Sequence, residues 1–202
     1  MAITTYAELQ TAVGNWLDHA LFTARIPEFI TLFESTANLR LRVRQQETTA
    51  SPAVTSGQAP LPTDYLSWRR VAASGDQIIE LGYVHPSYLI AAHPTFPESG
   101  TPRDFSIQGG NILVAPFGSE TLIFQYFAKI PALSDSATTN WLLTAHPDLY
   151  LFGSLVESEM FGVNDDRAAL WKARTDTIFD EIEKLSNKTR GAGAIRTMGP
   201  TP

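Results

Sequence analysis

The sequence predicts an α+β fold, in which N-terminal and C-terminal helices form a bundle and an antiparallel β region is inserted between them. Two observations predict it: apolar residues recur at helical spacing near both ends of the chain, and the middle consists of short apolar runs separated by Pro and Gly. We expect one domain over residues 1–187, with helices over about 5–44 and 141–187 and the β insertion over about 46–133. Because residues 188–202 are rich in Gly and Pro and lack periodicity, we expect them to form a flexible tail.

Two helices are predicted in the first 44 residues. Thr5 and Glu8 have the spacing of a capping box, in which each side chain accepts a hydrogen bond from a backbone N–H at the helix start. An apolar stripe follows at helical spacing, made of Tyr6, Leu9, Val13, Trp16 and Leu17. A second stripe starts near Thr23 and tolerates Pro27 in its first turn. It consists of Ile26, Phe29, Ile30, Phe33, Ala37 and Leu41.

Strands and turns are predicted for the middle of the chain. The segment TTASPAVTSGQAPLP favours an irregular edge hairpin, because proline cannot donate to a strand ladder. Two strands are expected about the turn Ser74-Gly75-Asp76. A clearer hairpin is expected about Gly109-Gly110, because glycine readily adopts positive φ. We also expect a strand in TLIFQYFAKI and a short helical turn over residues 86–92.

Helical periodicity returns after Leu133. One helix is predicted from about Pro147 to Val163. A second helix begins with Asp165 and Asp166, whose charge suits the positive end of a helix dipole. Its apolar face is expected to consist of Leu170, Trp171, Ile178, Ile182 and Leu185.

The stretch that contains His146, Pro147 and Asp148 has two interpretations, which differ in function. A histidine beside a carboxylate can serve in acid or base catalysis. Alternatively, Pro147 begins a helix, His146 caps it and Asp148 lies at the positive end of its dipole. We favour the second interpretation, in which Trp141 and Leu142 pack against the helical core and the stretch is scaffold.

Composition excludes several classes of function. Cysteine is absent, which excludes disulfides, thiolate metal sites and cysteine nucleophiles. No apolar run is long enough to span a membrane, and we expect no signal peptide. Residues 134–183 hold ten acidic and three basic residues, a local charge of −7, whereas the chain from Lys184 onward carries +4. This asymmetry is typical of an interaction tail, and the net charge of −6 argues against a nucleic-acid-binding protein.

Patterns of catalytic or metal-binding residues are weak. No two of the four histidines have the spacing of a helical zinc pair, and Ser154 lacks the G-x-S-x-G frame of a nucleophile elbow. Glu157 and Glu159 are two residues apart and point to different faces of a helix, so they do not pair as acid and base. We therefore predict no catalytic residue, no metal and no cofactor.

Arginine groups and tryptophans each allow two interpretations. Arg40, Arg42 and Arg44 could face phosphates, as could Arg69 and Arg70 beside Trp68. Arginines more often pair with carboxylates, however, and this chain has a surplus of them. We interpret the tryptophans as core residues and not as contacts with a ligand or another subunit. They are Trp16, Trp68, Trp141 and Trp171.

Several motifs resemble the adaptor, or head-to-tail connector, proteins of tailed bacteriophages. These motifs are TYAELQTAVGNWLD, TARIPEFITLFE, LPTDYLSWRRV, GGNILVAP and, most specifically, YFAKIPALSDSATTNWLLTAHPDLYLFGSL. The resemblance covers about Thr5 to Leu185 and contains no catalytic residues to carry over. It implies a structural protein of the virion neck, made in the host bacterial cytoplasm, without enzymatic activity or membrane contact.

The resemblance also implies how the protein works. Such proteins form a ring, usually of twelve subunits, that docks beneath the portal protein of the filled capsid. The ring contacts tail or neck proteins and extends the channel through which double-stranded DNA passes without sequence recognition. The helical part is expected to build the ring, the β part to face outward or toward tail components, and the extension from Asn187 to Pro202 to reach the portal protein. The expected portal-binding residues are Arg190, Ile195, Arg196 and Met198, and the expected subunit or channel contacts are Arg40, Arg42 and Arg44.

Two other functions stay open at this point. One is a neck or tail-completion protein that binds on the tail side, which composition does not distinguish from an adaptor. A small hydrolase that uses scattered carboxylates belongs to another class, and it would bring several acidic side chains together in a cleft.

Overall fold

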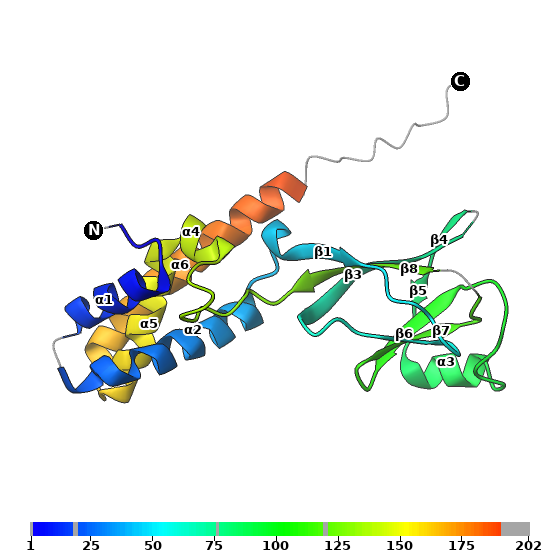
Figure 1. The fold of residues 1–202 in the computed structure, drawn as a ribbon, viewed down its shortest axis with the longest axis horizontal. Helices are drawn as coiled ribbons and strands as arrows, with labels where there is room; N and C mark the ends of the chain where they lie inside the picture. Colours follow the sequence, from blue (N-terminus) through cyan, green and yellow to red (C-terminus); the bar gives the residue numbers. More distant parts are fainter. Residues whose placement is uncertain (1, 18–19, 76, 119–120, 191–202) are drawn as a thin grey trace, which may run out of the picture. The chain divides into compact units, whose positions relative to one another are not determined.

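The computed structural model describes residues 2–17, 20–75, 77–118 and 121–190, and the chain divides into two compact units. The helical unit comprises Met1–Gln45 and Ile130–Pro202, and the β unit comprises Gln46–Lys129 (Figure 1). Both ends of the chain therefore contribute to one unit, and the other unit is inserted between them in sequence. The prediction of mixed helices and antiparallel sheets is confirmed.

The helices of the helical unit largely follow the predicted pattern. In chain order they are α1 (Tyr6–Trp16), the 3-10 helix η1 (Ala20–Arg25), α2 (Ile26–Arg40), α4 (Trp141–Ala145), α5 (Pro147–Phe161) and α6 (Asp165–Arg190). The 3-10 helix η2 (Arg44–Gln46) crosses the boundary between the two units. The capping box of α1 is confirmed: the Glu8 N–H donates to Thr5 Oγ1 at 3.3 Å, and Glu8 Oε2 accepts from the Thr5 N–H at 3.0 Å.

Three helix boundaries differ from the predicted ones. Helix α2 begins at Ile26, because the ring of Pro27 would clash with the carbonyl of Thr23 in an α-helix that started further upstream. Helix α5 ends at Phe161, two residues before the predicted Val163. Helix α6 continues to Arg190, into the segment predicted as tail, and residues 191–202 lie outside the described residues.

The helices of the helical unit share one apolar core. Every residue of the second predicted stripe, from Ile26 to Leu41, is buried, and so are Tyr6, Leu9 and Val13 of the first stripe. Helix α5 contacts α1, α2, α4 and α6, so it lies at the centre of this packing.

Three residues that were predicted to face the core are exposed instead. The exposed fraction is 44% for Trp16, 61% for Leu170 and 63% for Leu185. Leu170 and Leu185 lie near opposite ends of α6, which has 26 residues, whereas its main neighbour α5 has 15. Leu185 lies in the part of α6 that extends beyond the shorter α5, whereas Leu170 is adjacent to Trp171 and points about 100° away from its core-facing side chain.

The β unit consists of two four-stranded sheets and one helix. The first sheet has the strand order β1 (Glu47–Ala50), β8 (Thr121–Ala128), β3 (Tyr65–Ser74) and β4 (Ile78–Glu80). The second has the order β2 (Gln58–Pro60), β7 (Asn111–Ala115), β6 (Asp104–Gln108) and β5 (Gly82–Tyr83). Apolar residues of both sheets meet in one core, and α3 (Pro86–Ala92) packs on the second sheet through Leu89.

Two predicted hairpins and the short helix are confirmed. Gln108 pairs with Asn111 across Gly109 and Gly110, whose φ values are +60° and +81°. Ser74 pairs with Ile78, so β3 and β4 form the second hairpin, although Asp76 in its turn lies outside the described residues. Helix α3 covers the predicted residues 86–92.

Two predictions about the β region hold only in part. In the segment TTASPAVTSGQAPLP, Thr55 and Gln58 form an antiparallel bridge across a tight turn at Ser56 and Gly57. The strands on either side of this turn do not pair with each other, because β1 pairs with β8 and β2 pairs with β7, at the edges of different sheets. The edge position itself was predicted, and it suits strands that contain or adjoin proline. The region is also not wholly antiparallel, because β5 and β6 are parallel. The connection between them includes α3 and is long enough to return the chain for a parallel pairing, which a tight hairpin cannot do.

Candidate functional site

The segment that precedes α4 is held on α2 by two polar side chains, of which Glu34 is buried. The Ile130 N–H donates to Asn38 Oδ1 at 2.8 Å, and the Leu133 N–H donates to Glu34 Oε1 at 2.9 Å. Because Glu34 and Asn38 are four residues apart, they lie on one face of α2. This segment has no regular secondary structure, so α2 supplies the acceptors that a strand or helix would otherwise provide.

A buried network extends from Glu34 to the start of α4. The Tyr150 hydroxyl donates to Glu34 Oε1 at 3.0 Å, and Asn140 Nδ2 donates to Tyr150 Oη at 2.6 Å and to the Pro131 carbonyl at 2.7 Å. Asn140 Oδ1 accepts from the Leu143 N–H at 2.8 Å and so caps α4. One amide therefore caps a helix, binds a loop carbonyl and orients a tyrosine.

Burial changes the acidity of both ionisable groups in this network. It raises the pKa of Glu34 above the ordinary value of 4.5, and the bonds from the Leu133 N–H and the Tyr150 hydroxyl partly oppose this rise. Burial, followed by the charge of Glu34, raises the pKa of the Tyr150 hydroxyl above the ordinary value of 10.0. The tyrosine therefore stays protonated and acts as a hydrogen-bond donor to the carboxylate.

The stretch around His146 is part of this scaffold. Pro147 is the first residue of α5 and His146 is its N-cap, as predicted, although the His146 side chain makes no capping hydrogen bond. The Leu149 N–H donates to Asp148 Oδ1 at 3.0 Å, so this carboxylate serves the helix start. Leu142 is fully buried and Trp141 packs against the same core.

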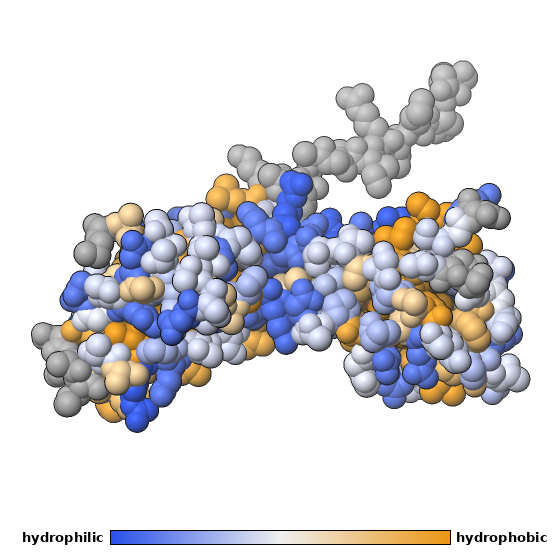
Figure 2. Space-filling view, in the orientation of Figure 1, coloured by the Kyte–Doolittle hydropathy of each residue, from blue (hydrophilic) through white to orange (hydrophobic). Residues whose placement is uncertain are grey.

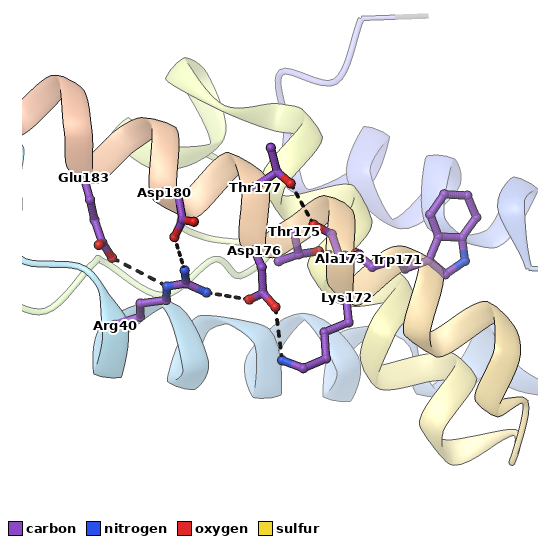
Figure 3. A network of polar contacts seen from close by, with 9 residues as sticks. All are labelled: Arg40, Trp171, Lys172, Ala173, Thr175, Asp176, Thr177, Asp180 and Glu183. Atoms are coloured by element: carbon purple, nitrogen blue, oxygen red, sulfur yellow. Dashed lines mark hydrogen bonds and ion pairs between the residues drawn. The ribbon is translucent and has the colours of Figure 1, made fainter.

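Arg40 joins α2 to three carboxylates of α6 (Figure 3). Its guanidinium lies 2.5 Å from Asp176 Oδ1, 2.5 Å from Asp180 Oδ1 and 3.5 Å from Glu183 Oε1. It also lies over the ring of Phe179, 4.7 Å from the centroid. The planar fork of an arginine suits such multiple pairing, so Arg40 contributes to the packing of α2 and α6 within the chain.

Replacing Arg40 with methionine is expected to lower the free energy of unfolding by about 1–2 kcal/mol at low salt. The substitution leaves Asp176, Asp180 and Glu183 close together without their shared cation. These carboxylates are partly exposed, so the loss should shrink at 1 M salt. Urea unfolding at two salt concentrations measures both effects.

The matched control is R25M, because Arg25 pairs with Glu28 at 3.2 Å on the surface of the same helical unit. The R25M variant should lose less than about 0.5 kcal/mol of unfolding free energy at either salt concentration. Equal losses for R40M and R25M would contradict the role assigned to Arg40.

The other residues expected to contact subunits, the channel or the portal lie in three places. Arg42 follows α2, and its Nη1 donates to the carbonyls of Asn38 at 2.7 Å and Leu41 at 2.5 Å. Arg44 begins η2 and is exposed. Arg190 is the last residue of α6, but its side chain lies outside the described residues, and so do Ile195, Arg196 and Met198. The described residues therefore place Arg40, Arg42 and Arg44 but not the expected portal-binding group.

Aromatic side chains gather where α1, η1, α5 and the start of α6 meet, and we call this region the aromatic end. Phe152 and Trp171 stack with ring centroids 5.5 Å apart, and Trp16 packs edge-on against both rings. Phe161 packs against Phe22 at 5.5 Å. Phe161 is exposed, and so are its near neighbours in sequence Met160 and Val163, together with Leu170 of α6. Figure 2 shows apolar surface, in orange, over this end of the helical unit.

The aromatic end was only partly predicted. Trp171 packs against the core and Trp16 is partly exposed, so the sequence interpretation of the tryptophans as core holds for one and not the other. An exposed apolar surface of this kind is typical of a protein–protein contact.

The arginines of the β unit pair with carboxylates. Arg69 pairs with Glu47, and Arg70 Nε lies 3.4 Å from Glu80 Oε1. The indole of Trp68 is partly exposed and stacks on Tyr83 with ring centroids 5.5 Å apart. These pairs join strands of the β unit, as arginines beside a surplus of acids were expected to do.

Glu157 and Glu159, which were not expected to pair as acid and base, differ in their surroundings. Glu159 is buried and pairs with Arg167 at 3.1 Å, whereas Glu157 is half-buried and burial raises its pKa. In the β unit, His93 Nδ1 lies 2.7 Å from Glu98 Oε2, a pair that the sequence did not indicate. Within the described ranges, no group of three or more His, Asp or Glu side chains is arranged to hold a metal ion. No helix in those ranges is both long and apolar enough to cross a membrane.

Comparison with known proteins supplies the family. The chain has no match among curated proteins. The family model described as SU10 adaptor protein matches residues 4–198, which is nearly the whole chain. The chain therefore belongs to the SU10 adaptor protein family, a structural family of phage head-to-tail adaptors.

Proposed function

We propose that this adaptor is a ring-forming subunit of the phage connector in the virion neck, made in the host cytoplasm. The ring lies beneath the portal protein, joins head to tail and extends the DNA channel. One observation carries the proposal: the family match continues past α6, through Ile195 and Arg196 to Met198. The family match thus extends from the described helices into the C-terminal segment.

The C-terminal segment is the proposed portal-binding element. From Lys184 onward the chain contains four basic residues and no acidic residue. Ile195 and Met198 supply apolar anchors, and Arg190 and Arg196 supply charge. A short segment with few anchors suits binding in which the chain orders on its partner.

Two separate surfaces of the helical unit support contacts with neighbouring subunits. One is the aromatic end. The other is a face of α2 on which Leu32 and Leu39 expose 52% and 79% of their surface. A ring needs two different complementary faces on each subunit, and a chain with two distinct apolar surfaces meets this requirement. Arg40, Arg42 and Arg44, which lie at and after the end of α2, are the proposed polar contacts to a neighbouring subunit or the channel.

The acidic character of the chain suits the passage of DNA. A strongly basic channel wall would bind the phosphate backbone and slow the duplex, whereas a net charge of −6 disfavours such binding. Contact without sequence recognition needs no base-reading side chains.

Deletion of residues 191–202 is expected to abolish binding to the portal protein while the helical and β units remain folded. The reason is that the deletion removes Ile195, Arg196 and Met198 but no residue of either described core. Co-sedimentation with purified portal rings measures binding, and circular dichroism measures folding.

Two controls make this experiment decisive. Substitution of Arg196 alone by alanine should weaken binding less than full deletion does, and it should lower the sensitivity of the remaining binding to salt. Undiminished binding by the truncated chain would contradict the tail assignment. Binding of the full chain to a purified tail component, and not to portal, would favour a place on the tail side.

A further inference from the structure

A groove of about 480 Å³ lies beside the C-terminal end of α6. Its lining comes from three elements of the helical unit: Arg44 and Gln45 of η2, His146 at the start of α5, and Ile182, Leu185 and Ser186 of α6. Ile182 is buried, whereas 63% of Leu185 is exposed at the rim. An exposed leucine beside a groove is an apolar surface that a peptide segment can cover.

The chain itself supplies a segment within reach of this groove. Leu185 lies five residues before the end of α6, which corresponds to about 7.5 Å along the helix. The sequence GAG at residues 191–193 allows a reversal of direction, because glycine adopts positive φ without strain. Two extended residues after Gly193 span about 7 Å, which brings Ile195 level with Leu185.

The spacing of the next apolar residue also fits. Met198 follows Ile195 by three residues, or about 10 Å of extended chain, and so reaches the part of the groove lined by Ile182 and Arg44. Of the lining residues only Arg44 carries a full charge, and the sequence neighbours of the lining carry both signs, with Asp148, Glu181 and Lys184. Apolar anchoring is therefore expected to decide this contact.

We propose that residues 194–198, AIRTM, dock in this groove of their own chain while the subunit is free. Docking within one chain is favoured over docking on a second copy, because a short linker gives an effective concentration of about millimolar. The Ile195 and Met198 side chains are then covered until a stronger partner displaces them. The contact needs no portal protein, so it is tested on the free chain and can fail independently of the proposed portal binding.

A cysteine pair tests the contact directly, because the natural chain contains no cysteine. The double variant L185C/I195C, oxidised at low micromolar concentration, is expected to form a disulfide within one chain. Its matched control is L170C/I195C. Leu170 is on the same helix and is 61% exposed, but it lies fifteen residues earlier, about 22 Å further along the axis.

The rates of disulfide formation decide between the outcomes. Non-reducing electrophoresis and mass spectrometry should show intramolecular closure at least ten-fold faster for L185C/I195C than for L170C/I195C. Equal rates would overturn the proposal. Covalent dimers as the main product of L185C/I195C would overturn it too, because they would place the segment on a second copy.

A second measurement uses trypsin and needs no oxidation. Cleavage after Arg196 should be several-fold faster in L185D than in the natural chain, because the aspartate disrupts the docked contact. L170D should leave the cleavage rate unchanged. Equal cleavage in all three chains, each checked for folding by circular dichroism, would contradict docking in this groove.

Discussion

Replacement of Gly153 with alanine is expected to lower the free energy of unfolding by about 3 kcal/mol, although alanine normally favours a helix over glycine. A Cβ atom at this position of α5 would lie 2.0 Å from Cδ2 and 2.2 Å from Cε2 of Phe33 in α2. The Phe33 ring is itself buried and packs against Tyr150 and Phe179, so it has no space into which to move. Urea denaturation followed by circular dichroism measures the loss.

Gly14 provides the matched control, because it also lies inside a helix of the helical unit. A Cβ atom there would meet Ile26 Cδ1 at 3.4 Å, which is ordinary van der Waals contact. The G14A variant should therefore gain about 0.5–1 kcal/mol from helix propensity. If both variants were stabilised, the close approach of α2 and α5 at Gly153 would be wrong.

Replacement of Glu34 with alanine is expected to cost about 3 kcal/mol, because two buried donors lose their acceptor. These donors are the Leu133 N–H and the Tyr150 hydroxyl. Glu28 lies on the same helix with 62% of its side chain exposed, so the matched control E28A should lower the free energy of unfolding by less than about 1 kcal/mol. A loss in E34A no larger than that in E28A would show that the buried network does not hold the 130–140 segment.

The raised pKa of Glu34 also predicts a dependence on pH. The folded state binds the proton of this carboxyl more strongly than the unfolded state does. The stability that this proton binding contributes is therefore fully present below pH 4.5 and is lost as pH rises through the folded pKa of Glu34. The E34Q variant keeps an acceptor oxygen but does not titrate. The difference in unfolding free energy between natural chain and E34Q should therefore shift in favour of E34Q as pH rises from 4 to 8. A constant difference would contradict the raised pKa.

The sequence predicted best those features that depend on local spacing. The capping box of Thr5 and Glu8, the Gly109-Gly110 turn and the buried stripe from Ile26 to Leu41 follow from hydrogen bonding and periodicity within a few residues. The pairing of β1 with β8 depends instead on contacts between residues more than seventy positions apart. Nothing in the local pattern of TTASPAVTSGQAPLP distinguishes that pairing from a hairpin.

In the candidate contact surfaces, too, the sequence predicted features that depend on local spacing but not contacts between distant residues. Arg40 was expected to pair with carboxylates in general, but the partners on α6 are 136 or more positions away, so spacing could not identify them. Asn140 could have been found from its place before an apolar run, which is typical of an N-cap. Its bond to Tyr150 could not, because that contact depends on how α4 and α5 pack. The exposure of Leu185 likewise follows from the unequal lengths of α5 and α6.

An electron microscopy reconstruction of the intact particle neck tests the central claim most directly. We expect several copies of this chain in a ring beneath the portal protein, with helical units in contact with their neighbours and residues 191–202 on the portal surface. A neck in which this chain is absent from the portal-proximal ring, or is bound only to the tail, would contradict the account.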